Sequence, residues 1–381
     1  MIISRSRLIK IILIAMLVMG IVPPAMDWDK AYAVSDSDVI TSTAAMEQFL
    51  LSAMNERRGT VQFVYKGKTK NLKASIKQVL ASALEKDPYM NYTIESYGYS
   101  YKGSSSTAEV TMKFKYRETA KQTAYVDQQV KAILKKIITP GMNDHEKVKA
   151  IHDWVVLNLK YDTTLTKYTA YEGLKYGSAV CQGYSLLTYK LLKEAGISNL
   201  IVEGTAFSTQ DDGSQIGQLH AWNLVKLSGK WYHLDTTWDD PVPDVKGEIS
   251  TSYYLLSDEQ IGRDHKWTKS YPKAVTLYRD TLSQLIAKGG VKAAAYEQLA
   301  EELNYHLYDP EHLVTTSREL NEQVREAMAE GSNVLVFRFQ GSEAELRSVL
   351  QDVYQLGIKS LTYQHQAFED TEDLRVQVKW S

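Results

Sequence analysis

Three residue types that together perform thiol chemistry are spaced along the middle of the chain. Cys181, the single cysteine, begins a run with helical apolar spacing, and His220 and Asp235 follow on two segments with strand character. The N–H groups at a helix start and a nearby imidazolium both stabilise a thiolate, the reactive form of the thiol. A histidine can then transfer protons, and a carboxylate can orient its ring. These residues predict a Cys–His–Asp triad.

Each triad residue also has a purely structural interpretation. A lone cysteine is commonly buried as a small apolar side chain, or it could join two chains in a disulfide-linked dimer. His220 could be a hydrogen-bonded loop residue at the start of a strand, after a polar loop at 208–218. Asp235 could be a capping or ion-pair aspartate. The site prediction therefore depends on the three residues acting together.

Other polar and aromatic residues lie near the predicted triad. Gln182 and Gly183 leave the turn uncrowded, so a substrate carbonyl could approach and the backbone N–H of Cys181 could serve an oxyanion hole. Tyr176 and Gln182 are candidates to complete that oxyanion hole. One of the nearby tryptophans, Trp222, Trp231 or Trp238, could form a wall of a substrate groove, with core packing as the alternative. We expect structural roles for the neighbouring carboxylates and for two histidines on apolar faces: Asp239, Asp240, His152 and His233.

The sequence predicts neither a metal site nor a cofactor. No group of Cys, His and Asp residues has metal-ligand spacing, and no acidic loop of the calcium-binding type is present. The formal net charge is −2, so no basic surface for nucleic acid is expected.

The N-terminus predicts export. Arg5, Arg7 and Lys10 precede an apolar run at 11–22, and small residues follow up to Ala33. This order is typical of a secretory signal peptide over residues 1–33, with cleavage after Ala33 and a secreted or cell-envelope protein as the result. The run is short for a membrane span, which needs about 20 residues, so membrane contact is expected only if the segment is retained.

The remaining chain is long enough for more than one core, and its periodicity predicts an α+β protein with three parts. A small unit at 36–118 and a second at 313–381 each show the order α-β-α-β-β. Corresponding residues match, as in Thr41-Ser42 with Thr316-Ser317 and Glu47-Gln48 with Glu322-Gln323. We therefore interpret them as a duplicated unit on either side of a central domain at 119–290, with chance similarity as the alternative.

The central domain resembles the bacterial transglutaminase-like superfamily over about residues 127–260. Four motifs occur in order: His152-Asp153-Trp154 to Tyr161-Asp162, Gly177-Ser178-Ala179-Val180-Cys181-Gln182-Gly183-Tyr184, His220-Ala221-Trp222-Asn223, and Asp235-Thr236-Thr237-Trp238-Asp239-Asp240-Pro241. The resemblance implies a papain-like core in which Cys181 is the nucleophile, His220 the acid and base, and Asp235 the orienting carboxylate. The animal enzymes of the family depend on calcium, a property that this sequence does not support.

Together these features predict a secreted cysteine enzyme that acts on protein or peptide carboxamide or peptide bonds through a thioester. Peptide hydrolysis and glutamine acyl transfer both remain open, because the triad serves either. Envelope proteins are natural substrates for an exported enzyme. The alternative is a non-enzymatic surface binding or scaffold protein that retains the fold; the presence of all three triad residues argues against it.

Overall fold

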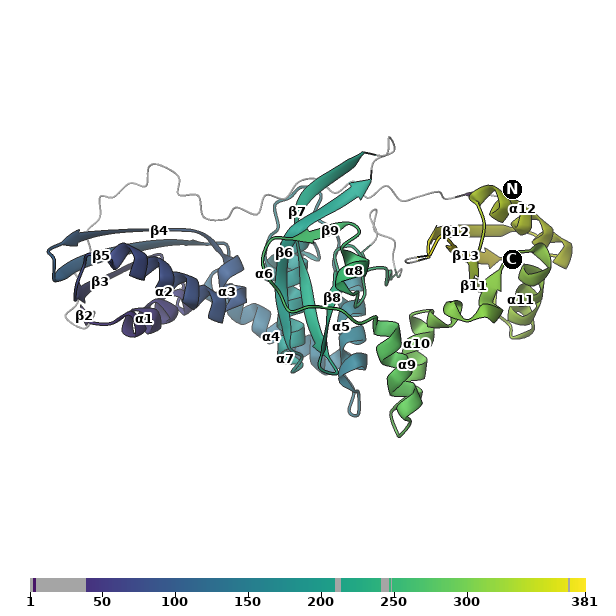
Figure 1. Cartoon of the computed structure of the whole chain (residues 1–381), viewed down its shortest axis with the longest axis horizontal. Coiled ribbons are helices and arrows are strands. Elements are labelled where there is room, and N and C mark those ends of the chain that lie inside the picture. The colour runs from purple at the N-terminus through teal and green to yellow at the C-terminus, as the bar shows by residue number, and fades with distance from the viewer. Residues whose placement is uncertain (1–2, 5–38, 210–213, 241–246, 248, 369–370) are drawn as a thin grey trace.

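The computed structural model describes residues 3–4, 39–209, 214–240, 247, 249–368 and 371–381. Three separate sheets and their helices form a central part flanked by two smaller units (Figure 1). The prediction of a mixed α+β protein is confirmed. The predicted signal peptide lies outside the described residues except for Ile3 and Ser4, which form β1 (Ile3–Ser4) beside the C-terminal sheet.

The N-terminal unit packs two amphipathic helices against one face of a four-stranded sheet of order β2-β3-β5-β4. Met46 and Leu50 of the first helix and Ile76 and Leu80 of the second are buried against Phe63 of the sheet. The elements are β2 (Val39–Ile40), α1 (Thr43–Asn55), β3 (Thr60–Lys66), α2 (Leu72–Lys86), α3 (Pro88–Thr93), β4 (Ile94–Gly103) and β5 (Thr107–Tyr116).

Helix α3 overlaps the start of the segment from Tyr92 to Tyr99, which the sequence alone would favour as a strand. Asp87 caps this short helix by accepting the N–H of Met90, and Pro88 occupies the first helical position, where its missing N–H costs nothing. The strand therefore begins only at Ile94.

The C-terminal unit has the same element order and the same strand order. Its elements are β10 (Leu313–Val314), α11 (Ser317–Ala329), β11 (Val334–Phe339), α12 (Glu343–Asp352), the 3₁₀ segment η3 (Val353–Leu356), β12 (Leu361–Ala367) and β13 (Leu374–Trp380). In both units the first two strands are parallel and the remaining strands of the unit pair antiparallel, while β1 adds a further parallel pair with β12 at the edge of the C-terminal sheet. The two units thus share a topology, while their origin by duplication stays a prediction.

The central part places four helices beside a sheet of order β8-β7-β6-β9. Helix α7 is buried along almost its whole length and packs against the middle strands β6 and β7, as expected for a helix that is apolar on several faces. The elements are α4 (Ala120–Ile137), α5 (Asp144–Asn158), α6 (Ala170–Tyr176), α7 (Cys181–Glu194), β6 (Asn199–Thr209), β7 (Gln215–Leu227), β8 (Lys230–Leu234) and β9 (His265–Trp267).

The hairpin of β6 and β7 is longer than the sequence predicted. Paired register extends to Thr209 and Gln215, so the predicted loop at 208–218 is wrong at both of its ends. Polar residues in this exposed extension resemble a loop in sequence, yet their backbone groups still pair across the hairpin. His220 consequently lies within β7, inside the sheet, and not at the start of a strand.

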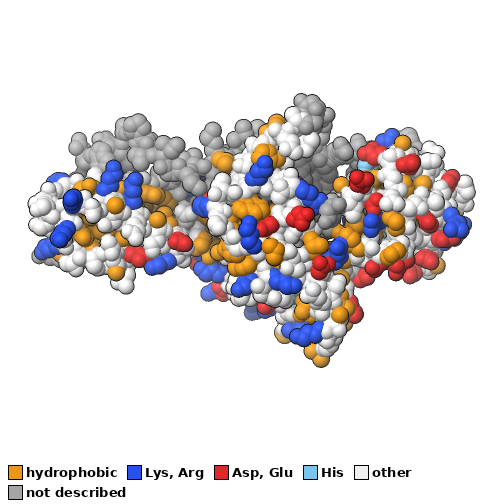
Figure 2. Space-filling view, viewed as in Figure 1, with side chains coloured by type: hydrophobic (Ala, Val, Ile, Leu, Met, Phe, Trp, Pro, Cys, Tyr) orange, Lys and Arg blue, Asp and Glu red, His pale blue; other side chains and the backbone are white. Residues whose placement is uncertain are grey.

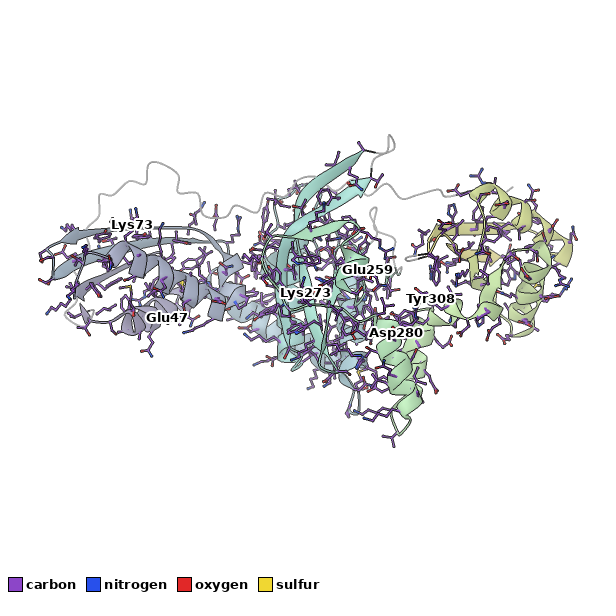
Figure 3. The ribbon with its side chains drawn as sticks, in the orientation of Figure 1. Glu47, Lys73, Glu259, Lys273, Asp280 and Tyr308 are labelled. Carbon is purple, nitrogen blue, oxygen red and sulfur yellow. The ribbon has the colours of Figure 1, made fainter. Side chains whose placement is uncertain are left out.

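The short helix α8 (Asp258–Ile261) lies between β8 and β9. Helices α9 (Tyr278–Lys288) and α10 (Ala293–Glu302) and the 3₁₀ segments η1 (Tyr305–Tyr308) and η2 (Pro310–His312) then lead to the C-terminal unit. Leu299 and Leu303 belong to the central hydrophobic core, which therefore extends beyond the predicted boundary at 290. The Arg279 guanidinium lies 3.5 Å from the ring centre of Tyr308, the residue labelled in Figure 3 near this junction.

The surface view shows acidic side chains gathered along the lower rim of the C-terminal unit (Figure 2). Within the described part of the chain, none of the helices combines the length and apolarity that crossing a membrane requires.

Candidate active site

Cys181 is the first residue of α7, and the segment before it is held from two sides. The N–H of Asp162 donates to the carbonyl of Ala179 at 2.9 Å, and the N–H of Val180 donates to the carbonyl of Lys167 at 2.9 Å. A Cβ on Gly183 would lie 2.5 Å from that of Ala179, so only glycine allows this close packing of the first turn. The start of α7 is therefore fixed, and the thiol with it.

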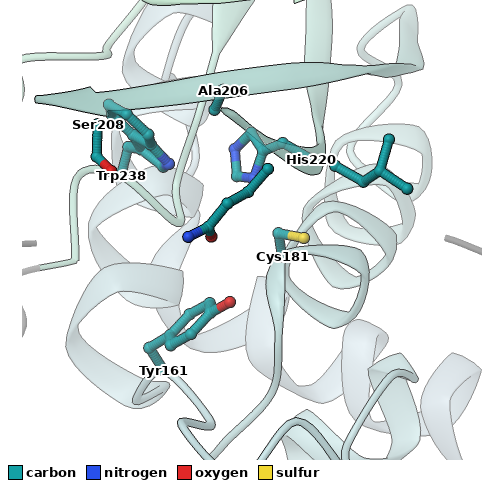
Figure 4. A pocket seen from close by; sticks show the side chains of 8 residues that line it. Tyr161, Cys181, Ala206, Ser208, His220 and Trp238 are labelled. Atoms are coloured by element: carbon teal, nitrogen blue, oxygen red, sulfur yellow. The ribbon is translucent and has the colours of Figure 1, made fainter. Parts of the chain in front are cut away.

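His220 extends from β7 between the thiol and a carboxylate. Its Nε2 lies 2.6 Å from Oδ2 of Asp235. The Cys181 thiol is close enough to the same ring to raise its pKa, and Nδ1 is the ring nitrogen that does not contact Asp235. Cys181 and His220 both border the same pocket in the close view (Figure 4). The structure therefore brings together the three residues that the sequence predicted as a triad.

The charge state of the pair follows from its surroundings. Burial alone lowers the pKa of His220, but the charge and hydrogen bond of Asp235, together with the Cys181 thiol, raise it to about 10. Burial raises the pKa of Asp235, yet the two histidines that contact it, His220 and His265, hold that pKa well below its usual range. The arrangement thus favours an imidazolium between a carboxylate and the thiol at neutral pH.

Asp235 is oriented by the turn that follows β8. Its Oδ1 accepts the backbone N–H groups of Thr237 at 2.9 Å and Trp238 at 3.2 Å, so only Oδ2 is directed at His220. Its own N–H donates to the carbonyl of Tyr253. The carboxylate is fully buried. This geometry fixes which ring nitrogen of His220 carries a hydrogen toward the carboxylate.

The two other carboxylates that the sequence offered near Asp235 have different partners. Asp239 Oδ2 lies 3.0 Å from Nε2 of His152, and Asp240 accepts the hydroxyl of Tyr184. They tie the turn to α5 and α7, respectively. His152 is fully buried within this network, in agreement with its predicted packing role.

A pocket opens beside the thiol, with a volume of about 260 Å³ that includes space open to solvent (Figure 4). The sequence did not predict Tyr161 as a site residue, although it belongs to the motifs quoted above, whereas Trp238 is one of the three tryptophans expected near a substrate groove. Gln218 also faces this pocket, and its Oε1 is buried with no hydrogen-bond partner among the described residues. The lining consists of Tyr161, Cys181, Ala206, Ser208, Gln218, Leu219, His220 and Trp238.

The three predicted substrate or oxyanion residues do not line this pocket, which corrects their assignment. The Gln182 amide donates to the carbonyl of Tyr92 at 2.9 Å, because one step along a helix turns a side chain by about 100° from Cys181. Tyr176 ends α6 and is 61% exposed. Trp222 is buried beside His220, with ring centres 5.8 Å apart, and donates to Nδ1 of His233. Trp222 thus packs against the His220 ring from within the core.

Two groups of described residues have ligand atoms close enough for a metal ion: the buried His220, Asp235 and His265, and the surface group Asp309, Glu311 and His312. In the buried group, both histidines already hydrogen bond to the shared carboxylate. We therefore interpret it as a hydrogen-bonded network.

Comparison with known proteins identifies the kind of core in the central part of the chain. Residues 131–236 match the family model of the transglutaminase-like superfamily. The chain therefore contains a transglutaminase-like core, and the resemblance found in the sequence is confirmed.

Among individual proteins, the chain is similar to the kyphoscoliosis peptidases of Homo sapiens and Mus musculus. Identity is 28% over 136 residues for the human protein and 27% over 131 for the mouse protein. The matches cover about a third of this chain (33% and 32%) and 20% of the length of each relative.

Solved structures with partial similarity include a putative cysteine protease from Cytophaga hutchinsonii and a TGase. The first has a TM-score of 0.25 at 14% identity and covers 46% of this chain and 77% of that protein. The second has a TM-score of 0.27 at 14% identity, with coverage of 60% and 64%. At these scores the superpositions carry no argument about activity.

Proposed function

We propose that the protein is a cysteine enzyme that transfers acyl groups from protein or peptide substrates through a thioester on Cys181. The observation that supports this most strongly is the chain of contacts from the thiol through His220 to Asp235, all buried, beside an open pocket. A transglutaminase-like core and similarity to proteins named as peptidases agree with the proposal.

The first half of the reaction forms the thioester. The Cys181 thiolate attacks the carbonyl carbon of a carboxamide or peptide bond, and the carbonyl oxygen takes up the displaced electron pair. The Cys181 backbone N–H at the start of α7 and the Tyr161 hydroxyl in the pocket lining are the donors that we assign to this oxyanion. The His220 imidazolium then gives its proton to the leaving nitrogen as the carbon–nitrogen bond breaks.

The second half regenerates the thiolate. Neutral His220 accepts a proton from water or from an amine as either one attacks the thioester carbonyl, and the thiolate leaves. Water yields a carboxylic acid, as in proteolysis or deamidation, and an amine yields a new amide. Asp235 remains ionised throughout and stabilises the imidazolium.

The proposal is tested by alkylating the full-length protein with iodoacetamide over a range of pH and following the mass of the intact chain. Because Cys181 is the single cysteine, every labelling event reports this site. We expect a labelling midpoint well below about 8.5, the value for an ordinary thiol, and a return to that value in His220→Ala. A wild-type thiol that titrates ordinarily and ignores the substitution would refute the proposal.

A glutamine-containing protein substrate then shows which of the two acyl acceptors, water or an amine, the enzyme uses. Incubation with a labelled primary amine distinguishes amide formation from release of ammonia or peptides. Cys181→Ala serves as the control in both assays, because it removes the nucleophile while leaving its small buried position filled.

We also propose export, on the basis of the N-terminal sequence, and envelope or secreted proteins as substrates. Expression of the full chain in a bacterial host, followed by N-terminal sequencing of the protein outside the cytoplasm, tests this part. We expect a chain that begins at Val34; an intact N-terminus retained inside the cell would contradict it.

A further inference from the structure

A second histidine contacts the carboxylate of the candidate triad. His265 Nε2 lies 3.2 Å from Oδ2 of Asp235, the same oxygen that His220 approaches at 2.6 Å. All three side chains are buried. Oδ2 is therefore shared by two imidazole rings, and the activity proposed above does not by itself require the second one.

The other nitrogen of His265 also meets a carboxylate. Nδ1 lies 2.5 Å from Oδ1 of Asp264, and Oδ2 of Asp264 accepts the hydroxyl of Tyr253 at 2.6 Å. An ionised carboxylate only accepts hydrogen bonds. When Asp235 and Asp264 are both ionised, both nitrogens of His265 must carry hydrogen, and the ring is then an imidazolium.

Short-range packing holds the ring in this position. Strand β9 pairs with β6, with His265 opposite Ala206 and Trp267 opposite Gly204. A Cβ on Gly204 would lie 2.2 Å from the carbonyl oxygen of Lys266, so the close approach of β9 depends on this glycine. The Trp238 ring meets that of His265 edge to face, with ring centres 4.7 Å apart.

We propose that His265 is a positioning residue of the thiol site, a charged clamp that holds the same oxygen of Asp235 as His220 does and moderates how strongly Asp235 retains the His220 proton. This inference rests on the proposed function. It assigns to the site a fourth residue, from a strand beyond the predicted triad, and an outer link through Asp264 to Tyr253.

The clamp acts through charge as well as geometry. The rings of His220 and His265 are 5.3 Å apart, close enough for a positive charge on one to disfavour a positive charge on the other. The groups that face His265 from the elements packed around it are Asp235 after β8, Asp264 beside it in the chain, His220 on β7, His233 on β8 and Tyr253 before α8. Loss of the positive charge on His265 therefore favours retention of protons by both the Cys181 thiol and His220.

The test compares His265→Gln with wild type in alkylation by iodoacetate, an anionic reagent that reacts best with a thiolate beside an imidazolium. The glutamine amide can still donate to Asp235 but carries no charge. We expect both limbs of the bell-shaped pH–rate profile to move to higher pH, the alkaline limb by about one unit and the acidic limb by less. His145→Gln is the matched control, because His145 is also buried but bonds to Tyr278 and Ser228, and its profile should equal that of wild type.

The outcomes separate this inference from the proposed function. A folded His265→Gln protein with wild-type midpoints overturns the clamp, whereas a wild-type thiol that titrates ordinarily and does not respond to His220→Ala overturns the triad itself. A purely structural role would lower the melting temperature without moving the midpoints.

A second measurement requires no substitution. In an NMR spectrum of protein labelled with ¹⁵N-histidine, the ring of His265, assigned through its contacts with Trp238 and Asp264, should carry hydrogen on both nitrogens at pH 7. A single protonated nitrogen would overturn the proposal.

Discussion

Replacing Asp235 with asparagine should disable the site through the tautomer of His220. The backbone N–H groups of Thr237 and Trp238 donate to Oδ1 at 2.9 and 3.2 Å, so the amide oxygen of the new side chain must take that place. Its NH₂ group then replaces Oδ2, 2.6 Å from Nε2 of His220. A donor there forces Nε2 to become an acceptor and places the ring hydrogen on the nitrogen that faces the thiol.

The size of the expected loss of turnover follows from the removal of that proton acceptor and of the buried charge. Without the carboxylate, the pKa of His220 falls from about 10, because burial then acts without the opposing charge. The equivalent change in a serine triad lowers turnover about 10⁴-fold, which corresponds to ~5.5 kcal/mol of transition-state stabilisation. We expect a loss of this order here.

The assay is the pH dependence of Cys181 alkylation, followed by turnover once a substrate is found. Alkylation of Asp235→Asn should follow an ordinary thiol, with a midpoint near about 8.5. Asp239→Asn is the matched control, since Asp239 is equally buried but contacts His152, and its alkylation profile should stay that of wild type even if the protein is less stable. A folded Asp235→Asn protein with the wild-type midpoint and more than about a tenth of wild-type turnover would refute the tautomer argument.

Three further predictions concern the surroundings of the triad. Tyr161→Phe removes the pocket hydroxyl assigned to the oxyanion and should lower turnover about 10²-fold while alkylation of Cys181 stays within a few-fold of wild type; an equal loss in both would indicate a damaged thiol instead. Gly204→Ala places a Cβ 2.2 Å from the Lys266 carbonyl and 2.7 Å from the Trp222 ring, so chemical denaturation should show ~1–3 kcal/mol less stability, and an unchanged midpoint would contradict the packing argument. Burial lowers the pKa of His145 to about 4 against the raising effect of Asp144. The contribution of the buried neutral ring to the free energy of unfolding is therefore fully present above about pH 6.5, and roughly 3 kcal/mol of it is lost as the pH falls toward 4. His145→Gln should flatten the pH dependence of unfolding in this window, and an equally steep dependence in the variant would rule out His145 as its source.

Local sequence signals determined much of the architecture. The capping box of Asn143 and Glu146, the turn at Ser228 and Gly229 and the amphipathic periods of α1, α2 and α11 depend on neighbours a few residues apart, so the local sequence is enough to specify them. Spacing along the chain also singled out Cys181, because the helix start after Val180 is itself a local feature.

The tertiary structure decided which side chains face the thiol. Gln182 follows Cys181 directly but turns to the carbonyl of Tyr92, ninety residues earlier, whereas Tyr161 reaches the pocket through its bridge to Ala179. His265 lies on a strand of three residues, too short to show any period, and it meets Asp235 only because β9 pairs with β6. Periodicity and capping act within an element, whereas these contacts depend on how distant elements pack, which no local pattern records.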